Sequence, residues 1–186
     1  IEIFRGYWLI SWFKKEFAQK EVMEALESDI QPEELLNRRL KEIPAGCDGL
    51  LLQPYFTPNL TMPEAKGSVI GLSDVHTRIH FYRAIIEGIN FALMDGMRHM
   101  EKRGGFRFEE IRVGGGGAQS SEICQITADM FGLPVVRTQT YEVSGIGSAI
   151  SAFVTLGVFE DYREALRCMV HKKDVFKPNR RQHAVY

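Results

Sequence analysis

Cysteine is scarce in this sequence, and long apolar runs are missing from it. The three cysteines (Cys47, Cys124 and Cys168) lie far apart and form no Cys-x-x-Cys pair, which disfavours a disulfide framework and a thiolate metal site. We therefore expect reduced thiols in a cytoplasmic protein. No apolar run approaches the roughly 18 residues of a membrane span, and no signal-peptide pattern is seen, so we expect no membrane partner.

A strong excess of one charge is also absent. The 23 lysines and arginines are balanced by 24 aspartates and glutamates, which gives a formal net charge of −1. Because nonspecific binding to nucleic acid requires a basic surface, no nucleic-acid partner is expected. The 186 residues, 45% of them apolar, suffice for one sizeable domain. The sequence opens on Ile1 in the middle of an apolar pattern, which suggests a fragment of a longer protein.

Glycine, by contrast, is abundant at one point, where Gly114 to Gly117 stand in a row. They follow an apolar strand pattern at residues 111–113 and precede a helical pattern at residues 121–131. Ser120 or the next serine would cap this helix, and Glu122 would suit its positive end. Because each glycine costs about 0.5–1 kcal/mol in a regular element, four in succession predict a loop.

This loop has two interpretations at this point. In the first, the glycines let an anion or a nucleotide lie against bare backbone beside the start of a helix. In the second, they make a tight strand-to-helix turn with no ligand. The loop is not a Walker A motif, because no Gly-Lys-Ser/Thr follows. It is not a Rossmann fingerprint either, because Gln119 and Ser120 stand where that motif requires Gly or Ala.

Helical and strand patterns alternate along the rest of the chain. The expected elements are a strand and turn within residues 1–10, a helix starting within 10–20 with Ser11 as its cap, two helices within 21–40, short strands at 49–56 and 67–72, a long helix at 76–103, a strand at 135–138, a close-packed helix of small residues within 140–157, a helix at 162–170 and a basic tail at 176–186. This order predicts an α/β domain with a mixed sheet flanked by helices.

The long helix at residues 76–103 has an apolar residue at every third or fourth position as far as Met100. Such a continuous stripe predicts a helix that packs one face into the core. Gly88 and Gly96 interrupt the pattern. They would suit a homodimer interface and close packing within the chain equally well.

Side chains that could carry chemistry are few. His76 and His80 are four apart, as metal ligands can be, but no third ligand is near in the sequence, so we expect two polar histidines on a helix surface. Asp74 would cap a helix, Glu87 would be a buried and paired structural residue, and Asp129 would be an exposed helical residue. We therefore name no catalytic base and no metal ligand.

Three stretches stand out together: GSVIGLSDVHTRIHFYRAIIEG at residues 67–88, VGGGGAQSSEICQITADMFGLPV at 113–135 and TYEVSGIGSAISAFVTLGVF at 140–159. In this order they resemble the second signature, the adenosine-binding loop with its helix, and the glycine- and alanine-rich helix of one family. That family is the FGGY family of carbohydrate kinases, in its carboxy-terminal domain. Ile146 and Ser148 depart mildly from the pattern of the last helix.

The resemblance implies an actin-like ATPase (ribonuclease H-like) fold, in which two domains close over ATP and Mg2+. It also implies the residues that would contact the nucleotide. These are Gly115, Gly116 and Gly117 in the loop, Ser120 facing the adenine or ribose, and Gly6 and Ser11 in a second segment, where Tyr7 and Trp8 are bulkier than the usual small residues.

The implied activity is ATP-dependent phosphorylation of a sugar or polyol hydroxyl, with a pentulose such as xylulose preferred over glycerol. Residues 1–186 would be the carboxy-terminal, nucleotide-binding part. An amino-terminal domain outside this sequence would supply the catalytic aspartate and most sugar contacts. The alternative is an actin-like nucleotide-binding module that senses or scaffolds without kinase activity. A plain α/β domain would leave the four glycines unexplained.

Overall fold

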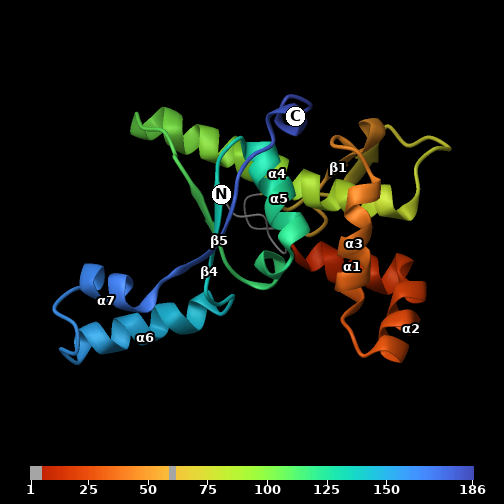
Figure 1. Cartoon of the computed structure of the whole chain (residues 1–186). Helices are drawn as coiled ribbons and strands as arrows, with labels where there is room; N and C mark the ends of the chain where they lie inside the picture. The colour runs from red at the N-terminus through yellow and green to blue at the C-terminus, as the bar shows by residue number, and fades with distance from the viewer. Residues whose placement is uncertain (1–5, 59–61) are drawn as a thin grey trace.

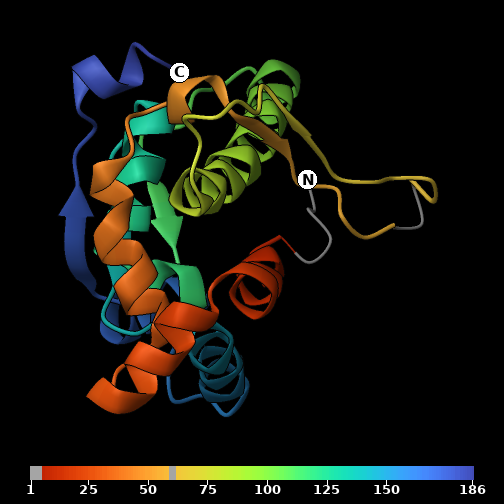
Figure 2. The ribbon, with the colours of Figure 1, turned by 90° about the vertical axis from the view of Figure 1, so that its right-hand side faces the viewer.

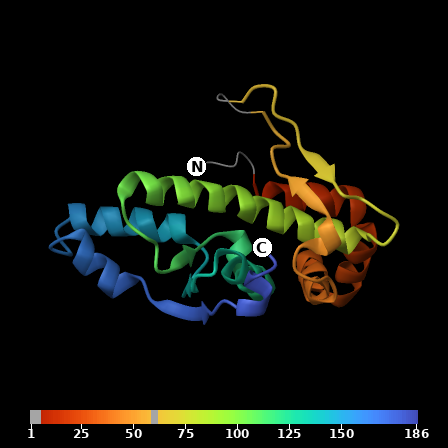
Figure 3. The same ribbon diagram turned by 90° about the horizontal axis from the view of Figure 1, so that it is seen from above.

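One long helix, α4 (Arg78–Gly104), runs through most of the molecule, and the other elements are arranged around it (Figures 1 and 3). The computed structural model describes residues 6–58 and 62–186. The other helices are α1 (Trp8–Phe17), α2 (Gln19–Ser28), α3 (Pro32–Arg39), α5 (Ser121–Phe131), α6 (Val143–Thr155), α7 (Tyr162–Met169) and α8 (Arg180–His183). Across the described residues, no helix combines the length and the apolarity that a membrane crossing requires.

The strands form two small sheets. β1 (Leu51–Gln53) pairs antiparallel with β2 (Ser68–Ile70). In the second sheet β3 (Ile111–Val113) runs parallel to β4 (Val135–Thr138), which runs antiparallel to β5 (Lys172–Phe176). The predicted mixed sheet is therefore confirmed, although β1 and β2 stand apart from it. The sequence pattern does not predict β5, because its charged, largely exposed residues follow no apolar pattern.

The long helix has clear start and stop signals. The Thr77 hydroxyl accepts a hydrogen bond from the backbone N–H of Ile79 at 3.3 Å, and the His80 ring accepts one from the N–H of Thr77 at 3.0 Å. This reciprocal capping box fixes the first turn. The helix ends at Gly105, whose φ of 66° is the left-handed conformation that glycine adopts most readily. The predicted helix at residues 76–103 is thus confirmed.

The main core lies where the first half of α4 meets α1, α3, α5 and β1. Ile86 is fully buried there, and a Cβ on Gly88 would lie 2.2 Å from the carbonyl oxygen of Leu52. Gly88 therefore serves packing within the chain. The second half of the predicted apolar stripe lies nearer the surface, where Met100 is 51% exposed.

The amino-terminal prediction needs correction. Residues 1–5 of the expected strand lie outside the described residues, and the rest of it is helical from Trp8 onward. Ser11 lies inside α1 and is exposed, so it is not a cap. The reason is tertiary: Leu9, Ile10 and Phe13 are spaced to bury one helical face, and this burial outweighs the strand propensity of the aromatic and branched residues.

The strand expected at residues 49–56 is also shorter than predicted. It is limited to β1, in which Leu52 is buried while Leu51 is 49% exposed. β2 confirms the strand expected at residues 67–72.

The helix of small residues is not close-packed, contrary to the prediction. α6 packs mainly against α7, and the two helices extend to one side of the molecule (Figures 1 and 3). A Cβ on Gly145 or Gly147 would meet no atom within 4 Å in the described structure. The small side chains of α6 therefore mostly face open space.

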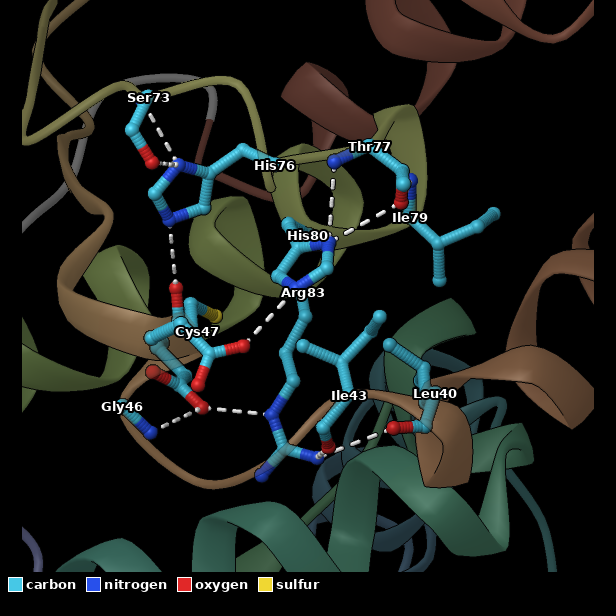
Figure 4. A network of polar contacts seen from close by, with 12 residues as sticks. Leu40, Ile43, Gly46, Cys47, Ser73, His76, Thr77, Ile79, His80 and Arg83 are labelled. Carbon is cyan, nitrogen blue, oxygen red and sulfur yellow. Dashed lines mark hydrogen bonds and ion pairs between the residues drawn. The ribbon is translucent and has the colours of Figure 1, made fainter.

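The predicted basic tail is an ordered part of the fold. Beyond β5 the chain forms α8, and the hydroxyl of Tyr186 reaches a buried ion pair on α4. There the Nε of Arg83 donates to Oε1 of Glu87 at 2.7 Å, and its Nη1 donates to the carbonyl oxygens of Leu40 and Ile43 (Figure 4). The expectation of a buried, paired Glu87 is confirmed.

His76 and His80 do not lie on an open helix surface, so this prediction is wrong. His76 precedes α4, and its Nε2 is 3.2 Å from the carbonyl oxygen of Cys47. His80 is 8% exposed, and its Nε2 is 3.1 Å from Oδ2 of Asp48 (Figure 4). Both side chains tie the loop around Gly46 to the start of α4.

The cysteines give a first prediction. Cys47 and Cys124 are buried, while Cys168 is exposed. Burial raises the pKa of Cys47 well above its usual range and that of Cys124 to about 11. Because the thiolate is the reactive form, iodoacetamide at pH 8 should alkylate Cys168 alone in the native protein and all three thiols in urea, as measured by mass spectrometry. Equal labelling of native Cys124 and Cys168 would contradict the packing described here.

Candidate functional site

The four glycines lie between β3 and α5, as the sequence predicted. The chain passes through one 3-10 turn, η3 (Gly116–Gln119), and Ser120 then caps α5. The Ser120 hydroxyl accepts from the N–H of Ile123 at 3.2 Å and donates to the Glu122 carboxylate at 3.0 Å. The predicted strand, loop, cap and helix are confirmed.

At three of the four positions, contacts or backbone conformation within the protein explain why the residue is glycine. A Cβ on Gly114 would lie 2.4 Å from the side chain of Val143, and one on Gly117 would lie 3.1 Å from the ring of Tyr7. Gly115 has a φ of +82°, which side chains with a Cβ rarely adopt. Packing and backbone conformation therefore account for these three positions without a ligand.

Gly116 differs from its three neighbours. A Cβ at this position would meet no atom within 4 Å, and its φ lies outside the left-handed range. Gly116 also lines a cavity of about 850 Å³. Since nothing in the described part of the chain excludes a side chain at this position, the free space beside its backbone is available to a ligand.

The cavity lies between α1, α3 and the start of α5. Figure 2 shows α3 (orange) running beside α5 (teal). Tyr7 and Ser11 line it from the start of α1, Asn37 lines it from α3, and Ser121 lines it from α5. Burial raises the pKa of Tyr7 well above its usual range, and its ring packs closely against Gly117. A cavity of this size and mixed polarity suits a nucleoside-sized ligand.

Asn37 in the cavity wall has a side-chain amide that is held in place from the core. Its Oδ1 accepts a 2.8 Å hydrogen bond from the hydroxyl of Tyr82, which is buried in the core. This bond fixes the amide, and its nitrogen has no partner among the residues that the structure describes. The Asn37 amide can therefore donate to an acceptor on a ligand.

The charges in the cavity favour an uncharged group over a polyphosphate. Glu33 pairs with Lys14 at 2.6 Å, Glu34 pairs with Arg38, and Glu122 accepts from Ser120 at the start of α5. The Glu122 carboxylate offsets the positive end of that helix. All three carboxylates therefore have partners, and no cluster of three metal-ligating side chains occurs in the described residues.

The structure brings together four of the six predicted site residues, which line the same cavity: Ser11, Gly116, Gly117 and Ser120. Gly115 lies beside it, and its N–H donates to the carbonyl oxygen of Tyr141 at 2.9 Å. Gly6 precedes α1, and its carbonyl accepts from the N–H of Leu9 at 3.1 Å. Neither Gly115 nor Gly6 is among the residues of the cavity wall.

Two of the acidic side chains considered in the sequence differ from expectation. Asp74 is exposed and does not cap α4, because Thr77 takes that position. Asp129 is 8% exposed, and its Oδ1 accepts from the side chain of Gln125 and the N–H of Asn179, both at 2.8 Å. Asp129 therefore anchors the carboxy-terminal segment rather than facing solvent.

Three residues of the site were not predicted from the sequence: Tyr7 in the cavity wall, Asn37 as a hydrogen-bond donor to a ligand, and Arg137 as a contact of the glycine turn. The Nη1 of Arg137 donates to the carbonyl oxygens of Ala118 and Gln119. The sequence did contain a signal for Tyr7. A bulky side chain next to predicted nucleotide-contacting residues must pack beside the binding site and can therefore form its wall. No local pattern marks Asn37 or Arg137.

The comparisons with known proteins agree with this architecture. Residues 6–156 match the model of the carboxy-terminal domain of the FGGY family of carbohydrate kinases. An uncharacterized sugar kinase, YgcE, of Escherichia coli K12 is 31% identical over 174 residues, which cover 94% of this chain and 35% of the relative. A xylulose kinase of Staphylococcus epidermidis is 34% identical over 184 residues, which cover 97% of this chain and 35% of the relative.

A solved structure extends the comparison to the fold. The crystal structure of xylulose kinase from Rhodospirillum rubrum aligns with a TM-score of 0.75 and 28% identity, over 95% of this chain and 34% of that one. The fold is the actin-like ATPase fold that the sequence resemblance implied. This chain spans about a third of the length of these relatives, 34–35% in each. Since the family model matches well over half of it, the chain belongs to the FGGY family of carbohydrate kinases.

Proposed function

We propose that this chain is the nucleotide-binding part of an ATP-dependent carbohydrate kinase, with the adenosine of ATP in the cavity beside Gly116. The observation that carries the proposal is the open space at Gly116, which packing and backbone conformation leave unexplained. The family of the chain and the xylulose kinase among its relatives support phosphoryl transfer to a sugar hydroxyl.

The cavity supports binding of the nucleoside rather than of the phosphates. Gly116 and Gly117 would lie against the nucleotide, Ser120 and Ser11 would flank it, and Asn37 would donate to the base or ribose. The remaining two predicted residues, Gly115 and Gly6, would act by shaping the adjoining turns.

The reaction requires groups that this cavity does not supply. In the proposed kinase, Mg2+ neutralises charge on the transferring phosphoryl group. Because the carboxylates of the cavity are paired, we place the metal ion, the catalytic base and most sugar contacts in an amino-terminal domain that completes the enzyme. We also place this enzyme in the cytoplasm.

For the acceptor we propose a pentulose such as xylulose, on the strength of the name of the Staphylococcus epidermidis relative. A polyol such as glycerol is the second choice. A nucleotide-binding module with a sensing or scaffolding role would show nucleotide binding without sugar phosphorylation. Assaying the full-length protein with ATP and xylulose separates the two, because only the kinase forms ADP in proportion to the sugar consumed.

The first test is calorimetric titration of the 186-residue chain with ATP and ADP, with and without Mg2+. We expect weak binding that is largely indifferent to Mg2+, because the adenosine half of the site is present and the phosphate half is not. If neither this chain nor the full-length protein binds adenine nucleotides at millimolar concentration, the proposal is wrong.

Replacing Gly116 with valine should weaken nucleotide binding without unfolding the protein. The valine side chain would fill the space proposed for adenosine, and overpacking of about 1–3 kcal/mol corresponds to a rise of roughly fivefold to 150-fold in the ATP dissociation constant. Gly145→Val is the matched control, since a Cβ at that position is equally free of neighbours but lies on α6, outside the cavity. Unchanged ATP affinity in a folded Gly116→Val protein would remove this turn from the site.

A further inference from the structure

We infer that Arg137 is a positioning residue for ATP binding, which it supports by clamping the glycine turn from the neighbouring strand. The inference rests on the proposed function and deepens it. Arg137 belongs to β4, and its side chain is 16% exposed. It is not among the residues that line the cavity, so it would act through the turn rather than on the nucleotide.

The guanidinium of Arg137 holds the segment that joins the glycines to α5. Its Nη1 donates to the carbonyl oxygen of Ala118 at 3.1 Å and to that of Gln119 at 2.9 Å. Its Nη2 donates to the hydroxyl of Ser121 at 3.3 Å. These bonds lie on both sides of Ser120, and Gln119, Ser120 and Ser121 all line the cavity.

The other side of Arg137 is anchored on β5. Its Nε and Nη2 lie 2.8 Å and 2.6 Å from Oδ2 of Asp174, the residue opposite it in the strand register. The guanidinium carbon lies 5.3 Å from the centre of the Phe176 ring. One planar fork thus joins the turn to two strands, a geometry that a lysine ammonium cannot reproduce.

Such a clamp is needed because the turn has few side chains of its own. A glycine backbone has more conformational freedom to lose than that of any other residue, and ordering a segment on binding costs affinity. By fixing two carbonyl groups and one hydroxyl in advance, Arg137 would reduce that cost. Its loss should therefore lower ATP affinity more than it lowers stability.

The test compares Arg137→Met and Arg137→Lys in the full-length protein, with ATP affinity from calorimetry and thermal unfolding measured in parallel. Losing these charge-assisted bonds should raise the ATP dissociation constant about tenfold or more in both variants. Arg137→Lys keeps the charge next to Asp174 and should melt close to the wild type. The control is Arg112→Met on β3, which removes an exposed arginine paired with Glu110 and should change neither quantity.

A split in the kinetic constants gives a second readout. KM for ATP should rise while kcat and KM for the sugar stay near the wild-type values, a pattern that general destabilisation does not produce. Wild-type ATP affinity in a folded Arg137→Lys protein overturns the inference and leaves the proposed function intact. Absence of ATP binding by the wild type overturns the proposed function and this inference with it. If Arg137→Met does not fold, Arg137→Lys decides the matter.

Discussion

Replacing Ile86 with aspartate should leave the protein without a cooperative unfolding transition. Ile86 is fully buried on α4, at the centre of the main core. The substitution removes about 1.5–3 kcal/mol of apolar burial and places a carboxylate where water does not reach. The expected loss exceeds about 4–5 kcal/mol, which is comparable to the roughly 5–15 kcal/mol that stabilise a typical domain. Urea unfolding followed by circular dichroism measures it.

The matched control lies farther along the same predicted stripe. Met100 is 51% exposed, so Met100→Asp should change the free energy of unfolding by no more than about 0.5 kcal/mol. An Ile86→Asp protein with the wild-type urea midpoint would show that this face of α4 is not in the core. A large loss in Met100→Asp would show that the second half of the stripe is buried in solution.

The parts of the fold that the sequence predicted correctly are those with local signals. The Ser120 cap of α5 is set by a few neighbouring residues. The cap of α4 was predicted at Asp74, three residues before Thr77, which takes that position in the structure. Periodicity then identifies the buried face within such an element, as Ile86 shows. The carboxy-terminal half of α4 has the same spacing of apolar residues, but it extends beyond the main core, so its apolar residues are not all buried.

The parts that the sequence did not predict depend on distant partners. β5 is a strand because β4 offers it a ladder, and its own charged residues give no strand pattern. α1 is a helix because its apolar face packs on α4, although its composition favours a strand. The close packing predicted from the small residues of α6 was wrong for a related reason. Small side chains permit close packing, but they do not supply a neighbouring element.

The candidate site shows the same division. The four glycines are visible in the sequence, but only the structure separates Gly116, which faces free space, from the three glycines that packing or conformation explains. Asn37 lies far from the glycines in the sequence, and the hydroxyl of Tyr82 that orients it comes from α4. The site is therefore a property of how α1, α3 and α5 meet, which no single motif encodes.

Replacing Arg83 with methionine should destabilise the protein by about 3–5 kcal/mol, because it leaves a buried carboxylate without its counter-ion. Arg83 is 7% exposed and Glu87 is 2% exposed. The Glu87 Oε1 would retain the Tyr186 hydroxyl at 2.6 Å and the N–H of Gly46 at 3.3 Å, while its Oε2 has no partner in the described structure. Two carbonyl oxygens would also lose their donor (Figure 4).

A double variant distinguishes the cost of the unpaired charge from the cost of lost packing. Arg83→Met combined with Glu87→Leu removes both charges, so it should recover part of the stability lost in Arg83→Met, since an apolar pair of similar volume often replaces a buried ion pair at little cost. Arg112→Met, which breaks an exposed pair with Glu110, should cost no more than about 1 kcal/mol. Urea midpoints of the four proteins give the comparison. If Arg83→Met lost no more stability than Arg112→Met, the burial of the Arg83–Glu87 ion pair described here would be contradicted.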